Sequence, residues 1–186
     1  MRLAFRRHST YTNGEMASSR WLHDESFCPA WEYRSVFAAA MCADSRSVCD
    51  IGCGMQSLRS FLPKGVRYLP ADLVKRSDDT EVCDLNRKQL PTAHLSRADT
   101  VTLLGVIEYL LDPAWVFESL SPRIEKIVVS YVPVDLLKVD RRKRGWVNDF
   151  SAGDIVKMLH AADFQLRDMT LCDSTQILFL GGRRLS

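Results

Sequence analysis

Apolar and polar positions alternate along the chain between two patterns, short apolar runs and segments with helical spacing. Near-continuous apolar runs that are rich in β-branched residues are typical of strands buried on both faces of a sheet. Pro70 falls near the end of one such run, and we expect it to mark an edge or a bulge. The pattern predicts five strands, at residues 46–52, 66–73, 81–85, 98–106 and 126–132.

Helical spacing and capping signals occupy the segments between these runs. Asp112 is a suitable N-cap before Pro113, and Ser151 with Asp154 resembles a capping box. A long charged connection at residues 133–150 separates the last predicted parallel strand from the last helix. The predicted helices cover residues 29–42, 55–62, 113–120 and 151–164.

The end of the chain predicts two strands, at residues 165–173 and 176–181, with Asp173 opening a hairpin turn between them. Strands that alternate with helices favour a parallel sheet, and the hairpin adds an antiparallel strand at one edge. We therefore expect an α/β fold: a doubly wound, mostly parallel, seven-stranded sheet with an antiparallel C-terminal strand and helices on both faces.

Length and composition add limits to this picture. The 186 residues suit one domain at residues 26–186, preceded by a polar tail or lid at residues 1–25. A net charge of +2 is too small to indicate nucleic acid or an anionic membrane. No apolar run is long enough to span a membrane, and the first residues lack a signal-peptide core, so we expect a cytoplasmic protein. The six cysteines form no CxxC pair, which favours buried thiols over a metal site.

The stretch SVCDIGCGMQ at residues 47–56 is the strongest local signal. Asp50 lies near the end of a predicted strand, Gly52 and Gly54 allow a tight turn, and a helix follows, which is the order of a nucleotide-binding turn. A dinucleotide fingerprint would place a further glycine after this pair, and none is present. Asp72 ends the next strand, 22 residues after Asp50, where an acid can accept both ribose hydroxyls.

Together these segments resemble the class I S-adenosylmethionine-dependent methyltransferases, in particular small-molecule and MetW-like members. The resemblance covers roughly residues 46–184, and Gln56 departs from it by replacing a frequent third glycine. Its carriers are VCDIGCG (48–54), YLPADL (68–73), VCDLN (82–86) and LLGVIEYLLDP (103–113).

The resemblance implies S-adenosylmethionine as cofactor, and from the cysteine spacing we expect no metal. It implies that Asp50 and the backbone of Gly52 and Gly54 hold the methionine end, with Cys53 beside them. It further implies that Asp72 and Leu73 bind the ribose side, that Asp84 and Leu85 frame the adenine, and that Gly105 lies beside the sulfonium.

Methyl transfer requires an acceptor held in line, and a base only where the acceptor must lose a proton. We expect Glu108 and Tyr131 to be the catalytic, acceptor-facing groups. Tyr109, Trp146 and Asn148 are candidate substrate contacts. The basic run at residues 141–144 is either a solvated loop or a contact for an anionic group on the acceptor.

The sequence thus predicts an S-adenosylmethionine-dependent methyltransferase that acts on a small molecule, such as a sugar or another hydroxylated metabolite. One alternative is a non-catalytic, methyltransferase-like subunit that binds a partner, and Gln56 motivates it. A nicotinamide-dependent oxidoreductase is a weaker alternative. Nucleic acid is a disfavoured acceptor, because the chain has neither an NPPY-type motif nor an RNA-binding module.

Overall fold

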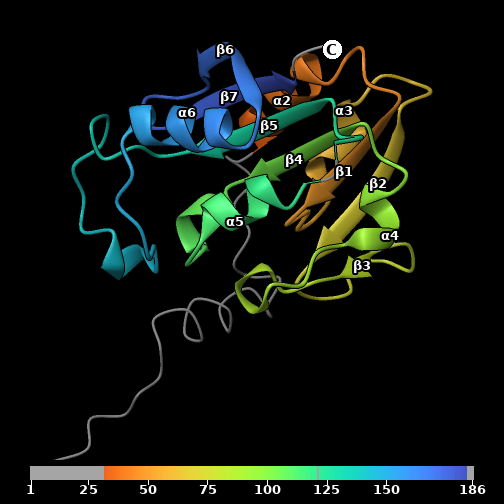
Figure 1. Cartoon of the computed structure of the whole chain (residues 1–186), viewed down its shortest axis with the longest axis horizontal. Helices are drawn as coiled ribbons and strands as arrows, with labels where there is room; N and C mark the ends of the chain where they lie inside the picture. The colour runs from red at the N-terminus through yellow and green to blue at the C-terminus, as the bar shows by residue number, and fades with distance from the viewer. Residues whose placement is uncertain (1–31, 121, 184–186) are drawn as a thin grey trace, which may run out of the picture.

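The computed structural model describes residues 32–120 and 122–183 (Figure 1). The expectations for residues 1–25, and for the helix start at Pro29, lie outside these described residues.

The fold is built on a seven-stranded sheet with the order β3-β2-β1-β4-β5-β7-β6. All neighbouring pairs are parallel except those made by β7, which runs antiparallel to both β5 and β6. This confirms the predicted mostly parallel sheet, although β7 lies one position inside the edge and β6 forms the edge itself. The strands are β1 (Ser47–Ile51), β2 (Arg67–Asp72), β3 (Glu81–Val82), β4 (Thr100–Leu104), β5 (Lys126–Tyr131), β6 (Phe164–Leu171) and β7 (Ile177–Arg183).

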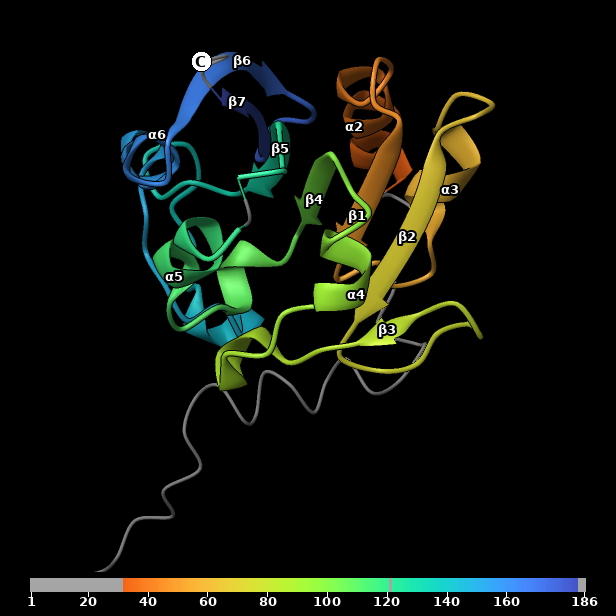
Figure 2. The ribbon, with the colours of Figure 1, turned by 45° about the vertical axis from the view of Figure 1, so that its right-hand side comes forward.

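Helices cover both faces of the sheet, as predicted (Figure 2). α2 (Glu32–Met41) and α3 (Ser57–Phe61) pack on one face. α4 (Thr92–Leu95), α5 (Pro113–Glu118) and α6 (Ala152–Ala161) pack on the other. Alternate residues of each central strand serve the two faces: in β5, Val128 contributes to the core under α2, whereas Ile127 and Val129 contribute to the core under α5 and α6.

The predicted caps are present. Asp112 accepts a hydrogen bond from Trp115 N at the start of α5, with Pro113 in the first helical turn. Ser151 and Asp154 form the reciprocal capping box of α6. These signals are local, so they define the helix starts without help from tertiary contacts.

Two segments differ from their predicted form. The strand expected at residues 81–85 ends at Val82, because Asp84 caps a 3₁₀ turn, η3 (Leu85–Arg87). α4 was not predicted, since its four residues are too few to show helical spacing. Pro70 lies inside β2 and pairs with Asp50, while β3 pairs only with Ala71 and Asp72, so within the described ranges no strand pairs with Pro70 on the side away from β1.

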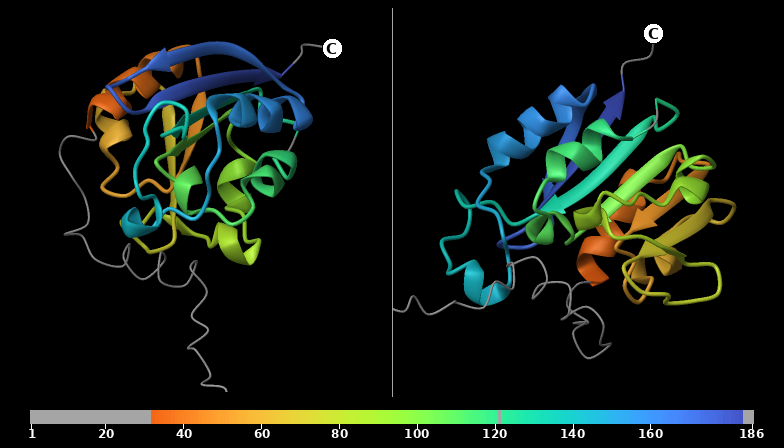
Figure 3. Two further views of the ribbon diagram at one scale, coloured as in Figure 1. Left: turned by 90° about the vertical axis from the view of Figure 1, so that its left-hand side faces the viewer. Right: turned by 60° about the horizontal axis from the view of Figure 1, so that its bottom comes forward.

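The 133–150 connection leaves the carboxyl end of β5 and returns to α6 (Figure 3). It contains one short 3₁₀ turn, η5 (Arg142–Arg144). A second turn, η4 (Ile107–Tyr109), follows the neighbouring strand β4. Both turns are therefore near the carboxyl end of the sheet, where parallel α/β folds bind their ligands.

Candidate functional site

The predicted site residues lie at or after the carboxyl ends of five adjacent strands, whose arrangement is seen in Figure 1. The chain reverses its direction of travel across the sheet between β1 and β4, so a crevice is expected outside this point. The segments after β1 and β4 are in close contact there: a Cβ on Gly52 would lie 2.4 Å from Val106 Cγ2. The structure thus brings the glycine turn and the Gly105 segment together.

The glycine turn is held tightly against the end of β2. Gly52 N and Cys53 N both donate to Ala71 O, at 2.8 and 3.1 Å. Gly52 has φ +76° and Gly54 has φ +50°, in the region that glycine adopts at least cost.

Gln56, the departure from the family pattern, has a definite structural role. It is the N-cap residue of α3 in a left-handed conformation, with φ +58°. Its side chain donates from Nε2 to Ser77 Oγ at 2.6 Å, and its Oε1 accepts from Arg59 at 3.1 Å. Gln56 therefore ties the glycine turn to the loop that follows β2.

Asp72 lies beside the same turn. Its Oδ2 accepts from Gly54 N at 2.8 Å and its Oδ1 accepts from Val74 N at 3.3 Å, with Arg76 Nε at 3.8 Å. The side chain of Asp72 is buried, and Leu73 beyond it is half-buried. The carboxylate predicted to bind ribose is thus oriented by the turn predicted to bind methionine.

Asp84 likewise accepts a backbone N–H group of the turn that follows its strand, β3. Its carboxylate accepts from Asn86 N at 3.0 Å and lies 3.5 Å from Arg87 Nε. Leu85 packs into the core, so its contact with adenine stays a prediction. Asn86, which sequence patterns did not single out, donates to Tyr109 O at 3.0 Å and accepts from Leu111 N at 2.9 Å, linking the ends of β3 and β4.

Asp50 is buried at 2% exposure and bonds across the sheet. It accepts from Thr102 Oγ1 of β4 and from Tyr68 Oη of β2, each at 2.6 Å. Burial raises the pKa of this carboxyl, and the two hydroxyl donors and Arg34 oppose the rise. Asp50 therefore cross-links three strands under α2 in addition to any part in binding.

Arg34 of α2 is a site residue that sequence patterns missed. A Cβ on Gly105, which has φ +70°, would lie 2.4 Å from its Nη1, so the glycine leaves the space that the guanidinium fills. Burial lowers the pKa of Arg34, and the negative charges of Glu108 and Asp50 are among the groups that oppose this. Its one available signal was helical spacing, because Arg34 shares a face with buried Ala38 and Cys42.

Glu108 in η4 is the buried carboxyl on the β4 side, at 2% exposure. Its Oε1 accepts from Val132 N at 3.1 Å, whereas Oε2 has no hydrogen-bond partner among the described residues. Burial raises the pKa of Glu108, and Arg34 and Arg141 are among the groups that oppose the rise. A buried oxygen without a donor is costly, and such sites in proteins call for an explanation by function or ligand.

Tyr131, the other predicted catalytic residue, is fully buried. Its hydroxyl donates to Asn148 Oδ1 at 2.7 Å and accepts from Arg141 Nη2 at 2.7 Å and Phe150 N at 3.0 Å. Burial raises the pKa of Tyr131 to about 12. These contacts hold the connection on the sheet, and a catalytic role for Tyr131 stays a prediction.

The three predicted substrate contacts bind one another or the backbone. Trp146 Nε1 donates to the Tyr109 hydroxyl at 3.2 Å. Asn148 donates from Nδ2 to Ile107 O at 2.6 Å and to Leu110 O at 3.2 Å. The connection is thereby fastened to η4, which brings these residues close to Glu108.

The basic run is largely paired within the protein. Arg142 bonds Asp149 at 2.6 Å, Lys143 lies 3.7 Å from Asp140, and Arg144 lies over the Trp146 ring at 5.3 Å. A hollow of about 620 Å³ beside the run is lined by the basic residues Lys138, Arg141 and Arg142, whose charges are largely offset by Asp140 and Asp149. The run therefore gives little support to an anionic acceptor.

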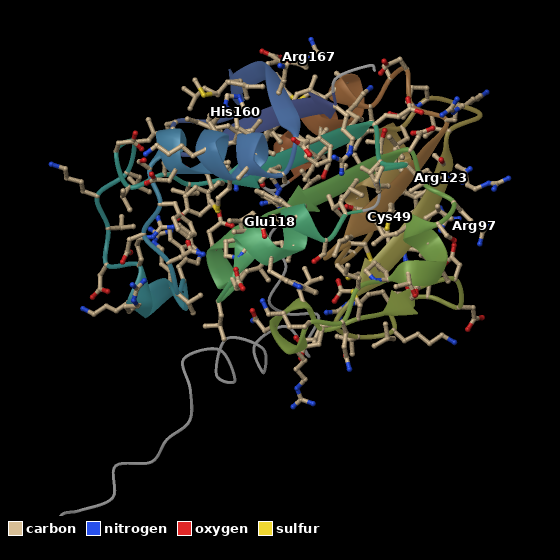
Figure 4. All side chains as sticks on the ribbon, in the orientation of Figure 1. Cys49, Arg97, Glu118, Arg123, His160 and Arg167 are labelled. Carbon is tan, nitrogen blue, oxygen red and sulfur yellow. The ribbon has the colours of Figure 1, made fainter. Side chains whose placement is uncertain are left out.

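The labelled side chains Arg97 and Arg123 lie at the opposite end of the sheet from the candidate site (Figure 4).

Other features of the described residues bear on the site only indirectly. They include no group of three or more His, Cys, Asp and Glu side chains that could hold a metal ion. Cys42, Cys49, Cys53 and Cys83 are buried free thiols and Cys172 is partly buried, as the sequence predicts. Within this part of the chain, no helix is long and apolar enough to cross a membrane.

Comparisons with known proteins decide the fold. No protein-family model matches the chain, and no curated protein matches it. The solved structure of a putative methyltransferase in complex with the Haloferax volcanii Trm112 methyltransferase activator is similar, with a TM-score of 0.70, 14% identity, and coverage of 91% of this chain and 98% of that one. The chain has the Rossmann-like methyltransferase fold.

Two further structures agree with this methyltransferase fold. Burkholderia thailandensis 1,6-didemethyltoxoflavin-N1-methyltransferase, solved with its substrate and S-adenosylhomocysteine, has a TM-score of 0.64 and 14% identity over 96% of this chain and 93% of that chain. Mitomycin 7-O-methyltransferase has a TM-score of 0.66 and 14% identity over 92% of this chain. The chain spans 59% of that enzyme's length.

Proposed function

We propose that this protein is an S-adenosylmethionine-dependent methyltransferase that acts on a small molecule. The observation that carries the proposal is the convergence of the glycine turn, Asp72 and Arg34 at the switch point of a methyltransferase fold. A tight glycine turn that a ligand can approach closely, a buried acid and a half-buried cation suit the polar groups of a nucleoside joined to an amino acid.

The residues present fit this cofactor. Gly52 and Gly105 are positions where a Cβ would collide with a neighbour, as expected of backbone that a ligand or a side chain must approach closely. In the proposal, Asp72 accepts the ribose hydroxyls, Arg34 pairs with the methionine carboxylate, and Asp84 meets the adenine amine. Asp50, Cys53, Gly54, Leu73 and Leu85 complete the proposed binding surface. When bound, the cofactor supplies an electrophilic methyl group on a sulfonium.

Glu108 is the proposed acceptor-facing residue. Its second oxygen lacks a donor among the described residues, and burial raises its pKa, which makes this carboxylate a stronger base than an exposed one. In this role Glu108 takes the proton from an O–H or N–H group of the acceptor as the methyl group is transferred. Tyr109, Trp146 and Asn148 shape the same side of the site.

A small acceptor agrees with the substrates named for two structural neighbours, 1,6-didemethyltoxoflavin and mitomycin. A sugar or another hydroxylated metabolite remains our proposal for its class. The alternative, a non-catalytic partner-binding subunit, rested on Gln56, and the bond from Gln56 to Ser77 gives that residue a structural reason instead. One structural neighbour was solved in complex with the Trm112 methyltransferase activator. Copurification therefore tests whether this chain also has a partner protein.

Calorimetric titration with S-adenosylhomocysteine tests the proposal. We expect the wild-type protein to bind with 1:1 stoichiometry, and Asp72→Ala to weaken binding about a hundredfold, or about 2.7 kcal/mol. Asp78→Ala is the matched control, because Asp78 lies in the loop that follows Asp72 and has a fully exposed side chain. Absence of heat with the wild-type protein, or equal affinities for the two variants, would contradict the proposed site.

A further inference from the structure

Arg141 is the one member of the basic run that is buried, at 5% exposure. Its guanidinium makes three hydrogen bonds of 2.7 Å: from Nε to Asn148 O, from Nη1 to Val132 O and from Nη2 to the Tyr131 hydroxyl. It also lies 4.5 Å from the centre of the Trp146 ring. Such a planar fork with several acceptors is a geometry that arginine forms and lysine does not.

Val132 connects this arginine to the buried carboxyl. Its carbonyl accepts from Arg141, and its N–H donates to Glu108 Oε1 at 3.1 Å. The main chain of Glu108 is also held, because its carbonyl accepts from Val147 N at 2.8 Å. Glu108 is thus bonded on one carboxylate oxygen and on its backbone, and only Oε2 lacks a hydrogen bond among the described residues.

We propose that Arg141 is a positioning residue, which orients Glu108 through the Val132 main chain so that Oε2 is presented to the acceptor. The acceptor part of this statement rests on the proposed function, whereas the link from Arg141 to Glu108 rests on geometry alone. The basic run then serves the site by holding the connection in place. It does not need to bind an anion.

The charged and titratable groups around Glu108 come from three elements. Arg34 faces it from α2, Arg141 from the connection, and Tyr131 from β5. Both cations lower the pKa of Glu108, against the rise caused by burial. Loss of the fork of Arg141 frees the Val132 N–H to move away from the carboxylate, and a weaker bond to the charged form raises the pKa.

The amide resonance of Val132, followed by ¹⁵N NMR through a pH titration, tests the link without cofactor or acceptor. In the wild-type protein we expect this resonance to titrate with Glu108, and Glu108→Gln to abolish that titration. Arg141→Lys keeps the charge and loses the fork. In this variant we expect the titration midpoint of the Val132 amide resonance to rise by about one pH unit and the amplitude of its shift to fall. Lys143→Met, which changes an exposed member of the same run, should titrate as the wild type does.

An unchanged midpoint and amplitude in folded Arg141→Lys would overturn the proposal, as would a wild-type Val132 amide that does not respond to Glu108. If Arg141→Lys does not fold, Tyr131→Phe removes one of the three acceptors of Arg141 and should shift the midpoint in the same direction by less. Calorimetry with S-adenosylhomocysteine on the same samples separates the two claims. A normal NMR response without binding refutes the proposed function, while binding with no change in Arg141→Lys refutes the positioning role.

Discussion

The hydrogen bonds that build the two halves of the site come from different parts of the chain. The β1–β3 half consists of the glycine turn, Asp72 and Asp84, and its carboxylates accept N–H groups of nearby turns, such as Gly54 and Asn86. The β4–β5 half is fastened by side chains of a distant connection: Asn148 reaches Ile107 O across 41 positions, and Arg141 reaches Val132 O. The first half consists of short turns at the ends of neighbouring strands, whereas the second depends on one connection docking correctly.

This difference suggests that the halves can be damaged separately. A change that disturbs the turns should affect both folding and cofactor binding, because the glycine turn also joins the ends of β1 and β2 in the middle of the sheet. A change in the connection should affect the acceptor side while leaving the cofactor side able to bind. The following variants test this separation.

Gly52→Ala should have the largest effect. The added Cβ meets Val106 at 2.4 Å and the residue has φ +76°, so overpacking adds to backbone strain. We expect a loss of about 3 kcal/mol in the free energy of unfolding, measured by urea denaturation. Gly153→Ala in α6 is the control, because its φ is ordinary and the added Cβ would meet only Ser151 Oγ at an ordinary contact distance of 3.7 Å, so it should be neutral or stabilising. Similar losses of stability in both variants would contradict the claim that the turn specifically requires glycine at position 52.

Asn148→Ala should have the next largest effect, about 2 kcal/mol of stability. It removes the donors to Ile107 O and Leu110 O and leaves the buried Tyr131 hydroxyl without its acceptor. Affinity for S-adenosylhomocysteine should nevertheless stay within about twofold, because no cofactor group of the proposal depends on Asn148. Lys143→Ala, which removes an exposed ion pair of the same connection, should change stability little. A large loss of affinity in Asn148→Ala would show that the halves are coupled.

Gly105→Ala should have the smallest effect on stability and a specific one on binding. Gly105 and Gly65 both have positive φ, so alanine strains both by about 1–2 kcal/mol. Only at Gly105 does the new Cβ meet the Arg34 guanidinium, whereas nothing lies within 4 Å at Gly65. We expect Gly105→Ala to weaken S-adenosylhomocysteine binding about tenfold, or about 1.4 kcal/mol, and Gly65→Ala to leave it unchanged. Equal affinities would argue against Arg34 as a cofactor contact.

The same contrast explains what the sequence could predict. Asp72, Asp84 and the glycine turn lie at the ends of apolar runs, and the caps of α5 and α6 use residues three positions apart, so local patterns were sufficient. The seven-stranded sheet followed from the alternation of the same runs. Strand and helix ends were less accurate, as at β3, where the cap made by Asp84 ended the strand early.

Arg34 and Arg141 were beyond local patterns for a physical reason. The role of each cation depends on groups that are distant in the sequence and that the fold brings to it. Arg34 lies near the charges of Glu108 and Asp50. Arg141 donates to the carbonyls of Val132 and Asn148. A run of four basic residues suggests an exposed anion contact, and only the tertiary structure reveals that its first member is buried.

The most direct test of the account is a crystal structure of the protein with S-adenosylhomocysteine bound. We expect the ligand at the carboxyl ends of β1, β2 and β4, with its ribose hydroxyls on Asp72 and its carboxylate on Arg34. A ligand bound elsewhere, or one whose ribose and carboxylate contact neither residue, would contradict it.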